Sequence, residues 1–316
     1  MTMEAIHEAV HDSYEASLLA LAERDPRVLV MTAENRAAIR GLPARLGPRF
    51  IDVGICEQTM VGMAAGLALR GRIPVVHALA TFLTLRAFEF IRTDVGIAGL
   101  PVKLIGGVPG FLSEANGPTH QAIDDIALMS TIPGMQVFCP ADNAELCAAL
   151  PEVLASPAPC YVRFNARPSS LKHEAFALGR AEVLADGNDL GVLVAGLLVP
   201  NVVDAATRLQ QEGIGTRVVN LRTLVPIDEA EVVRTAQRCK VLVTVEDHLL
   251  RGGLYAIVSE ILARRRINVP LCPMGLDARW FTPGLLPAVL DKEGFTPSRL
   301  ATRLYRALDT GEHEDA

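Results

Sequence analysis

Phe50-Ile-Asp-Val-Gly-Ile-Cys-Glu-Gln-Thr-Met-Val-Gly-Met-Ala-Ala-Gly-Leu-Ala68 joins a short apolar strand to a helix that is dense in small residues. A strand that leads directly into an apolar helix is typical of a βα unit in an α/β fold. One carboxylate, Glu57, stands at the junction. The helix dipole alone favours a carboxylate at this position. Glu57 therefore indicates a catalytic site only if other motifs support it.

Strand-length apolar runs alternate with segments of helical period in both halves of the chain, which predicts parallel sheets. In the first half we expect strands at 28–32, 74–78, 102–105, 136–140 and 160–164, and helices at 4–22, 58–69 and 85–97. In the second half we expect strands at 190–195, 215–220, 241–246 and 269–274, and helices at 202–212, 229–237, 255–266 and 297–308. The predicted fold class is α/β, with two doubly wound domains.

The periodicity weakens between Pro168 and Asp189, where Pro, Ser, Lys, His and an Asp-Gly-Asn string occur. Such composition is typical of a connection between domains. We therefore predict a first domain over 1–170, a linker over 171–188 and a second domain over 189–316.

Composition restricts the classes of function. The 316 residues include 30 Lys plus Arg and 36 Asp plus Glu, so the net charge is 30 − 36 = −6. No long run of basic residues occurs, which argues against binding to nucleic acid or to a membrane surface. The longest apolar stretch, Val192–Val199, is interrupted by Gly196, so no membrane-spanning helix is expected. Six scattered cysteines and an acidic first segment without a signal-peptide pattern predict a cytoplasmic protein with reduced thiols.

Two further segments follow the first one in a fixed order. They are Ala80-Thr-Phe-Leu-Thr-Leu-Arg-Ala-Phe-Glu89 and Ser113-Glu-Ala-Asn-Gly-Pro-Thr-His-Gln121. Together with residues 50–68 they resemble the C-terminal half of transketolase and of 1-deoxyxylulose-5-phosphate synthase, which are thiamine-diphosphate enzymes. The resemblance continues through 218–228, 243–248 and 251–254. It implies a cofactor pyrimidine-binding domain with a mostly parallel sheet, followed by a transketolase-like C-terminal domain.

The resemblance also implies how this chain handles thiamine diphosphate. Glu57 matches the buried carboxylate that hydrogen-bonds the pyrimidine N1′, after which the cofactor's own 4′-amino group removes the thiazolium C2 proton. Such a carboxylate needs apolar surroundings, which Ile55, Cys56, Phe82 and Leu85 could supply. Phe82 and Phe88 match aromatic residues that pack on the pyrimidine. The predicted cofactor-binding residues are therefore Ile55, Glu57, Phe82, Leu85 and Phe88.

The substrate side of the predicted site lies in the second motif. His120 matches a catalytic histidine that contacts substrate oxygen and moves protons, a role suited to imidazole. Asn116 stands where the family carries an Asp that binds a substrate hydroxyl, and Val108 falls near the place of a phosphate-binding histidine. Arg163 and Arg167 are the candidates for binding an anionic group, and the sequence does not choose between them.

A motif of the family is missing. Family members bind the cofactor's diphosphate and Mg²⁺ with Gly-Asp-Gly followed by Asn, and no Gly-Asp-Gly occurs in these 316 residues. We therefore expect a split enzyme in which an N-terminal transketolase subunit supplies the diphosphate-binding domain and the metal ligands. Two copies of each subunit would form a closed heterotetramer.

Three functions stay open. The first is the C-terminal subunit of a split transketolase, which moves a two-carbon ketol unit from a ketose to an aldehyde. The second is a decarboxylating enzyme that takes a keto substrate, either like 1-deoxyxylulose-5-phosphate synthase, which the single Arg86 before Ala-Phe favours, or like the β-subunit of a 2-oxo acid dehydrogenase. The third is a non-catalytic scaffold, against which the presence of both Glu57 and His120 argues.

Overall fold

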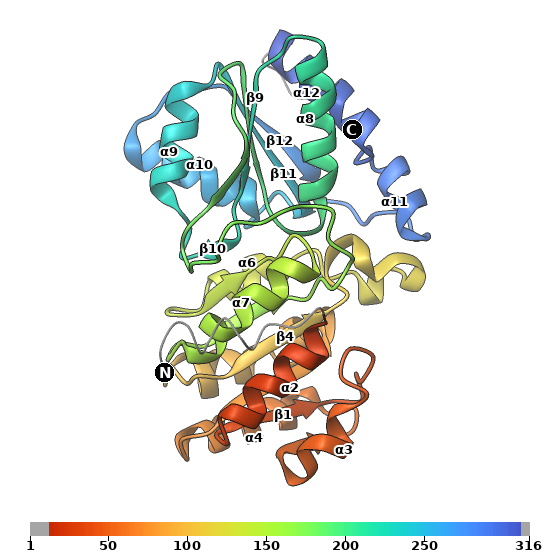
Figure 1. Cartoon of the computed structure of the whole chain (residues 1–316), viewed down its shortest axis with the longest axis vertical. Helices are drawn as coiled ribbons and strands as arrows, with labels where there is room; N and C mark the ends of the chain where they lie inside the picture. Colours follow the sequence, from red (N-terminus) through yellow and green to blue (C-terminus); the bar gives the residue numbers. More distant parts are fainter. Residues whose placement is uncertain (1–12, 311–316) are drawn as a thin grey trace. The chain divides into compact units, whose positions relative to one another are not determined.

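The computed structural model describes residues 13–310, which divide into two units (Figure 1). Within the described part, unit 1 holds residues 13–109 and 128–178, and unit 2 holds residues 110–127 and 179–310. The loop that carries Asn116 and His120 therefore belongs to unit 2. The domain limits 1–170, 171–188 and 189–316 stay a prediction, because the units are built from two segments each.

Unit 1 is built on a parallel sheet whose strands run in the order β5-β6-β4-β3-β1-β2. Their bounds are β1 Val28–Thr32, β2 Phe50–Asp52, β3 Ile73–Leu79, β4 Lys103–Gly107, β5 Gln136–Phe138 and β6 Cys160–Arg163. Thr32, the last residue of β1, pairs with Asp52 and with His77. The carboxyl ends of neighbouring strands thus meet at one edge, where α/β sheets place their ligand sites.

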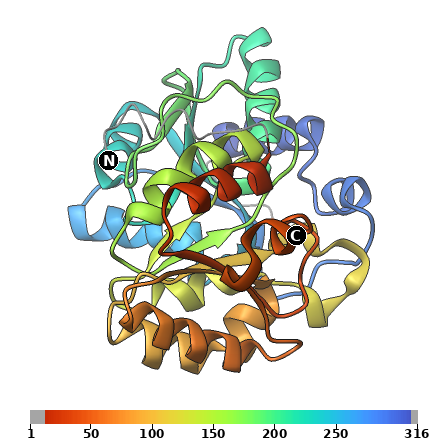
Figure 2. The ribbon, with the colours of Figure 1, turned by 60° about the horizontal axis from the view of Figure 1, so that its bottom comes forward.

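Helices cover both faces of this sheet (Figure 2). One face carries α2 (Tyr14–Arg24) and α7 (Asn143–Ala155), whose side chains form the main core with the strands. The other face carries α4 (Glu57–Leu69) and the π-helical segment η3 (Ile91–Gly96). The shorter helical segments are α3 Leu42–Leu46, η1 Gly47–Arg49, η2 Phe82–Arg86 and α5 Phe88–Phe90, while α6 Asp125–Ser130 begins in unit 2 and ends in unit 1.

Unit 2 has a second sheet, in the order β12-β11-β8-β9-β7. The strands are β7 Glu182–Ala185, β8 Leu190–Val194, β9 Thr216–Asn220, β11 Val241–Leu249 and β12 Leu271–Leu276, and all pairs except β7–β9 are parallel. Its remaining elements are η4 Gly110–Asn116, η5 Pro118–His120, η6 Gly196–Leu198, α8 Val199–Gln211, β10 Thr223–Val225, α9 Glu229–Arg238, α10 Leu254–Arg265, α11 Leu286–Lys292 and α12 Pro297–Thr310. The prediction of an α/β protein with two mostly parallel sheets is confirmed.

Three local expectations differ from the structure. The segment 171–188 was expected to be a linker, but Glu182–Ala185 forms the edge strand β7, which pairs antiparallel with β9. The single helix expected at 85–97 is instead three short helical segments, the π-helical η2 and η3 with α5 between them. The helix expected at 4–22 begins at Tyr14 within the described part, where Ser13 Oγ accepts the Ala16 amide as an N-cap, and its first residues lie outside the described residues. Within residues 13–310, no helix is both long and apolar enough to cross a bilayer.

Candidate functional site

Glu57 is the first residue of α4 and follows the carboxyl end of β2. The turn between them needs Gly54, whose φ of 73° lies in the left-handed region. The carboxylate of Asp52 fixes this turn by accepting the amides of Gly54 at 3.0 Å and Glu34 at 3.3 Å. Burial raises the pKa of Asp52, but these hydrogen bonds and the one from Arg36 together hold it below its ordinary value. An ionised Asp52 therefore sets the position at which α4 begins.

Glu57 is buried, with 2% of its side chain exposed, and it is paired with an arginine. Nη1 of Arg86 donates to Oε2 of Glu57 at 2.8 Å. The guanidinium of Arg86 also lies 4.2 Å from the centre of the Phe82 ring, a cation–π contact. The structure thus joins a carboxylate, an arginine and an aromatic ring at the carboxyl edge of the unit 1 sheet.

The expected apolar enclosure of Glu57 stays a prediction, because most of the residues named for it are exposed in this chain by itself. Ile55 is 69% exposed, Leu85 is 47% exposed, and Cys56 is exposed as well. Phe82 and Phe88 are half-buried. The group that faces the carboxylate is Arg86, a residue that the sequence reasoning noted but did not place in the site. The cofactor-binding roles of Ile55, Glu57, Phe82, Leu85 and Phe88 stay predictions.

His120 and Asn116 lie together on the second motif, in unit 2. The segment closes on itself, because the Gly110 amide donates to the Ala122 carbonyl at 2.8 Å. Gly117 has a φ of 82° at its turn. His120 is half-buried and its Nδ1 lies 2.9 Å from Oγ1 of Thr119, while the exposed Asn116 donates through Nδ2 to the Ser113 carbonyl at 2.9 Å. The motif therefore presents an imidazole and an amide from one compact loop.

The two candidate arginines differ in their surroundings. Arg163 is the last residue of β6, is buried, and pairs in register with Gly106 of β4. Arg167 is exposed. Val108, near the place where the resemblance implies a phosphate-binding histidine, has a φ of 49°, which is rare for a β-branched residue. Of the two arginines, Arg167 is the one whose side chain reaches solvent in unit 1.

Large apolar side chains are exposed on and near the Glu57 helix. We define the apolar face by those on α4, just before it, and on or next to the segments packed against it, namely Ile55, Met63, Leu69, Leu85, Phe90 and Ile97. On its other side α4 buries apolar residues against the sheet. Several large apolar side chains exposed near one helix are a feature of binding surfaces. The sequence reasoning missed the apolar face, although a surface helix that is apolar on all sides was the available signal.

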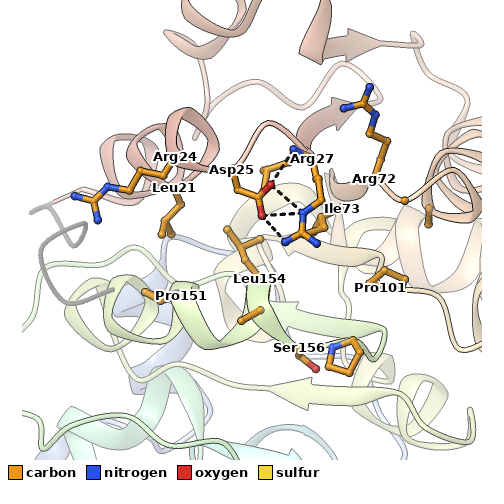
Figure 3. Close-up of a pocket in the computed structure, with 15 residues that line it drawn as sticks. Leu21, Arg24, Asp25, Arg27, Arg72, Ile73, Pro101, Pro151, Leu154 and Ser156 are labelled. Atoms are coloured by element: carbon orange, nitrogen blue, oxygen red, sulfur yellow. Dashed lines mark hydrogen bonds and ion pairs between the residues drawn. The ribbon is translucent and has the colours of Figure 1, made fainter. Parts of the chain in front are cut away.

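A separate cavity of 410 Å³ lies at the opposite edge of the same sheet, near the first residues of β1 and β3 (Figure 3). Its walls are mostly apolar, with Leu21, Ile73 and Leu154 among them. Asp25 at its rim is paired with Arg27 at 2.7 Å. None of the cofactor-binding, catalytic or substrate-binding residues predicted from the sequence lines this cavity, so the cavity is distinct from the candidate site.

Two family models match the chain. The model described as "Transketolase, pyrimidine binding domain" matches residues 8–168, and the one described as "Transketolase, C-terminal domain" matches residues 179–300. The chain is similar to a 6-deoxy-6-sulfo-D-fructose transketolase subunit of Clostridium sp. (strain MSTE9), at 36% identity over 95% of this chain and 94% of that protein. It is also similar to a putative transketolase C-terminal section of Methanocaldococcus jannaschii, at 30% identity over 97% of this chain and 98% of that protein.

Solved structures and longer proteins agree with these matches. A structure described as "Split gene transketolase, inactive beta4 tetramer" has a TM-score of 0.85 and 32% identity, covering 97% of this chain and 99% of that chain. The chain is 34% identical to a 1-deoxy-D-xylulose-5-phosphate synthase of Parasynechococcus marenigrum, of which it spans 48%, while the match covers 95% of this chain.

Proposed function

The chain belongs to the transketolase family, and on that basis we propose that it is the C-terminal subunit of a split, thiamine-diphosphate-dependent transketolase. In this proposal the enzyme transfers a two-carbon ketol unit from a ketose to an aldehyde acceptor. The observation that carries it is Glu57, a buried carboxylate that begins a helix at the ligand-binding edge of a parallel sheet, beside Phe82 and Arg86.

The residues of unit 1 fit the pyrimidine half of thiamine diphosphate. Within residues 13–310, Arg86 is the hydrogen-bond partner of the Glu57 side chain and occupies Oε2, so Oε1 remains for a ring nitrogen. Phe82 offers a half-buried aromatic surface on which a pyrimidine can stack. When bound, the cofactor supplies nucleophilic carbon chemistry. Glu57 holds the proton at N1′, Phe82 orients the ring, and His120 exchanges protons with substrate oxygen.

For the diphosphate end of the cofactor these 316 residues offer no family motif, since no Gly-Asp-Gly is present. We propose that an N-terminal transketolase subunit binds the apolar face and supplies the diphosphate and Mg²⁺ ligands. Two observations support this partner: the face includes exposed side chains on the helix that Glu57 begins, and the relatives of matching length are described as a subunit, a section and a split-gene protein. The assembly would contain two copies of each subunit.

The donor is proposed to be a ketose with an anionic end. Asn116 can hydrogen-bond a sugar hydroxyl without adding charge, and the exposed Arg167 can bind a sulfonate or phosphate. The subunit of Clostridium sp. is described with 6-deoxy-6-sulfo-D-fructose, which makes that sugar a candidate donor. A pyruvate-decarboxylating reaction is the second candidate, favoured by the 34% identity to a 1-deoxy-D-xylulose-5-phosphate synthase.

The test begins with the partner. The chain is purified from its native cells, and the co-purifying subunit is sequenced for Gly-Asp-Gly followed by Asn. The complex is then given thiamine diphosphate, Mg²⁺, an aldose acceptor and one of three donors: 6-deoxy-6-sulfo-D-fructose, xylulose 5-phosphate or pyruvate. Ketose products without carbon dioxide support ketol transfer, whereas carbon dioxide from pyruvate supports the second candidate.

Glu57 is tested in the same complex. Glu57→Gln keeps the shape of the side chain but cannot share its proton in the same way, so we expect ketol transfer to fall by at least about 100-fold. Full activity of Glu57→Gln would refute the role of Glu57. Absence of any partner, together with no binding of thiamine diphosphate and Mg²⁺, would favour the scaffold.

A further inference from the structure

We infer that Asp247, Gln121 and Phe281 are positioning residues that hold the loop 110–122, and with it His120 and Asn116, in a working geometry. This inference deepens the proposed function, because it rests on His120 acting on the substrate. The contacts below lie entirely within unit 2.

The first anchor is at the start of the loop. Asp247, near the end of β11, is buried and accepts the Phe111 amide through Oδ2 at 3.3 Å. The backbone at Gly110 approaches this carboxylate so closely that a Cβ added there would lie 1.9 Å from Oδ2. Gly110 also has a φ of 54°. Only glycine fits so close to the carboxylate. Asp247 therefore fixes the start of the loop against β11.

The second anchor is an aromatic cluster. Phe111 is fully buried and packs edge-on against Phe281, with ring centres 5.2 Å apart and an angle of 86° between the planes. Its ring also lies 5.3 Å from that of Phe295. Buried aromatic pairs of this geometry stabilise their contacts beyond the area that they bury. The beginning of the loop is therefore held by both a hydrogen bond and a packed ring.

The third anchor is at the end of the loop, directly after His120. Nε2 of the buried Gln121 donates to the Phe281 carbonyl at 2.9 Å. Two residues further on, the Ile123 carbonyl accepts the Leu249 amide at 2.8 Å. Phe281 thus contacts both ends of the loop, its ring at Phe111 and its carbonyl at Gln121. Fixing both ends limits the positions that the side chain of His120 can take.

Between the anchors, the loop is braced by its own bonds. The Gly110 amide donates to the Ala122 carbonyl, and the His120 amide donates to the Gly117 carbonyl at 2.9 Å. On this frame Asn116 is exposed and His120 is half-buried, and these are the two side chains assigned to the substrate. Catalytic groups need a supporting shell of this kind, because a misplacement of about 1 Å can reduce the rate by about 100-fold.

The experiment compares Gln121→Met with Ser259→Ala. Ser259 also donates from its side chain to a backbone carbonyl in unit 2, from Oγ to Tyr255 at 2.7 Å, so its loss is a control within α10 rather than in the loop or its anchors. Hydrogen exchange is measured on the full chain, and kcat, KM and thiamine-diphosphate binding are measured on the complex with its partner subunit. For Gln121→Met we expect exchange in residues 110–122 to accelerate about fivefold and kcat to fall about tenfold or more. Cofactor affinity and the unfolding midpoint should match those of the control.

Two outcomes would overturn the inference. One is faster exchange without a loss of kcat, and the other is an equal loss of kcat in Ser259→Ala. If Gln121→Met does not fold, Phe111→Leu weakens the second anchor more mildly, and the same split between kcat and cofactor binding is expected. A His120→Ala variant with full activity would refute the proposed role of His120 while the anchors are intact, which separates that failure from this one.

Discussion

Replacing Arg86 by Met tests whether the arginine compensates the buried charge of Glu57. Unit charges 2.8 Å apart attract by about 6 kcal/mol at an effective dielectric constant of about 20. Removing one partner of a fully buried pair costs about 3 to 5 kcal/mol, because the remaining charge stays buried. Since 38% of the Arg86 side chain is exposed, water already screens part of this attraction. We therefore expect the free energy of unfolding to fall by about 2 kcal/mol.

The assay is urea-induced unfolding followed by circular dichroism, with Arg27→Met as the control. Arg27 pairs with Asp25 at 2.7 Å, but both side chains are substantially exposed, so its loss should cost less than about 1 kcal/mol. A double variant, Arg86→Met with Glu57→Gln, removes the buried charge as well and should recover at least about 1 kcal/mol relative to additivity. Equal effects of Arg86→Met and Arg27→Met, or strict additivity in the double variant, would refute the compensation.

Three further predictions concern unit 1 and its surface. Burial lowers the pKa of His77 to about 3, so the folded protein does not take up a proton that the unfolded chain binds below a pH of about 6.5. The free energy of unfolding therefore falls as pH decreases from 6.5 towards 3, by about 2 kcal/mol between pH 7 and pH 5. Urea unfolding of His77→Gln at both pH values should lack this part of the pH dependence. Leu69→Glu should abolish binding of the partner subunit in a pull-down and change the free energy of unfolding by less than about 0.5 kcal/mol. The control Leu285→Glu, at a residue of unit 2 with the same 69% exposure, should bind the partner normally. Equal binding by both variants would show that the apolar face is not part of the interface. Gly106→Ala places a Cβ 2.6 Å from the Tyr161 hydroxyl, so we expect a loss of about 1 to 3 kcal/mol in urea unfolding, and unchanged stability would show that β4 and β6 can separate there.

Elements with a strong local signal were predictable from the sequence, and those that depend on distant contacts were not. Strand β1 begins and ends where predicted, because an apolar run at 28–32 is bounded by polar and turn residues. Helix α7 was missed because Pro151 interrupts its pattern. Its start did carry a signal, since Asp142 caps the amide of Glu145 at 3.0 Å. Strand β7 was missed because its pairing with β9 is antiparallel and at an edge.

In the candidate site, too, features set by local sequence were predictable and features set by distant contacts were not. The position of Glu57 at the start of α4 follows from the adjacent strand and helix, which local sequence determines. Its pairing with Arg86 joins residues 29 apart and depends on how η2 packs against α4. The contacts of Phe111 with Asp247 and of Gln121 with Phe281 span 136 and 160 residues. No local pattern could have assigned the loop 110–127 to unit 2.

Because the loop 110–127 belongs to unit 2, the proposed split enzyme would hold different parts of its site on different chains. Under the proposed function, this chain contains both the loop with His120 and the strand and aromatic cluster that hold it, while the partner contributes the diphosphate end. The anchors need no residue from another chain, because Asp247, Gln121 and Phe281 are all present within unit 2. Hydrogen exchange in residues 110–122 should therefore be alike in the isolated chain and in the complex, whereas exchange around Leu69 on the apolar face should slow when the partner binds. A loop that becomes protected only in the complex would mean that the partner, rather than unit 2, sets the geometry of His120.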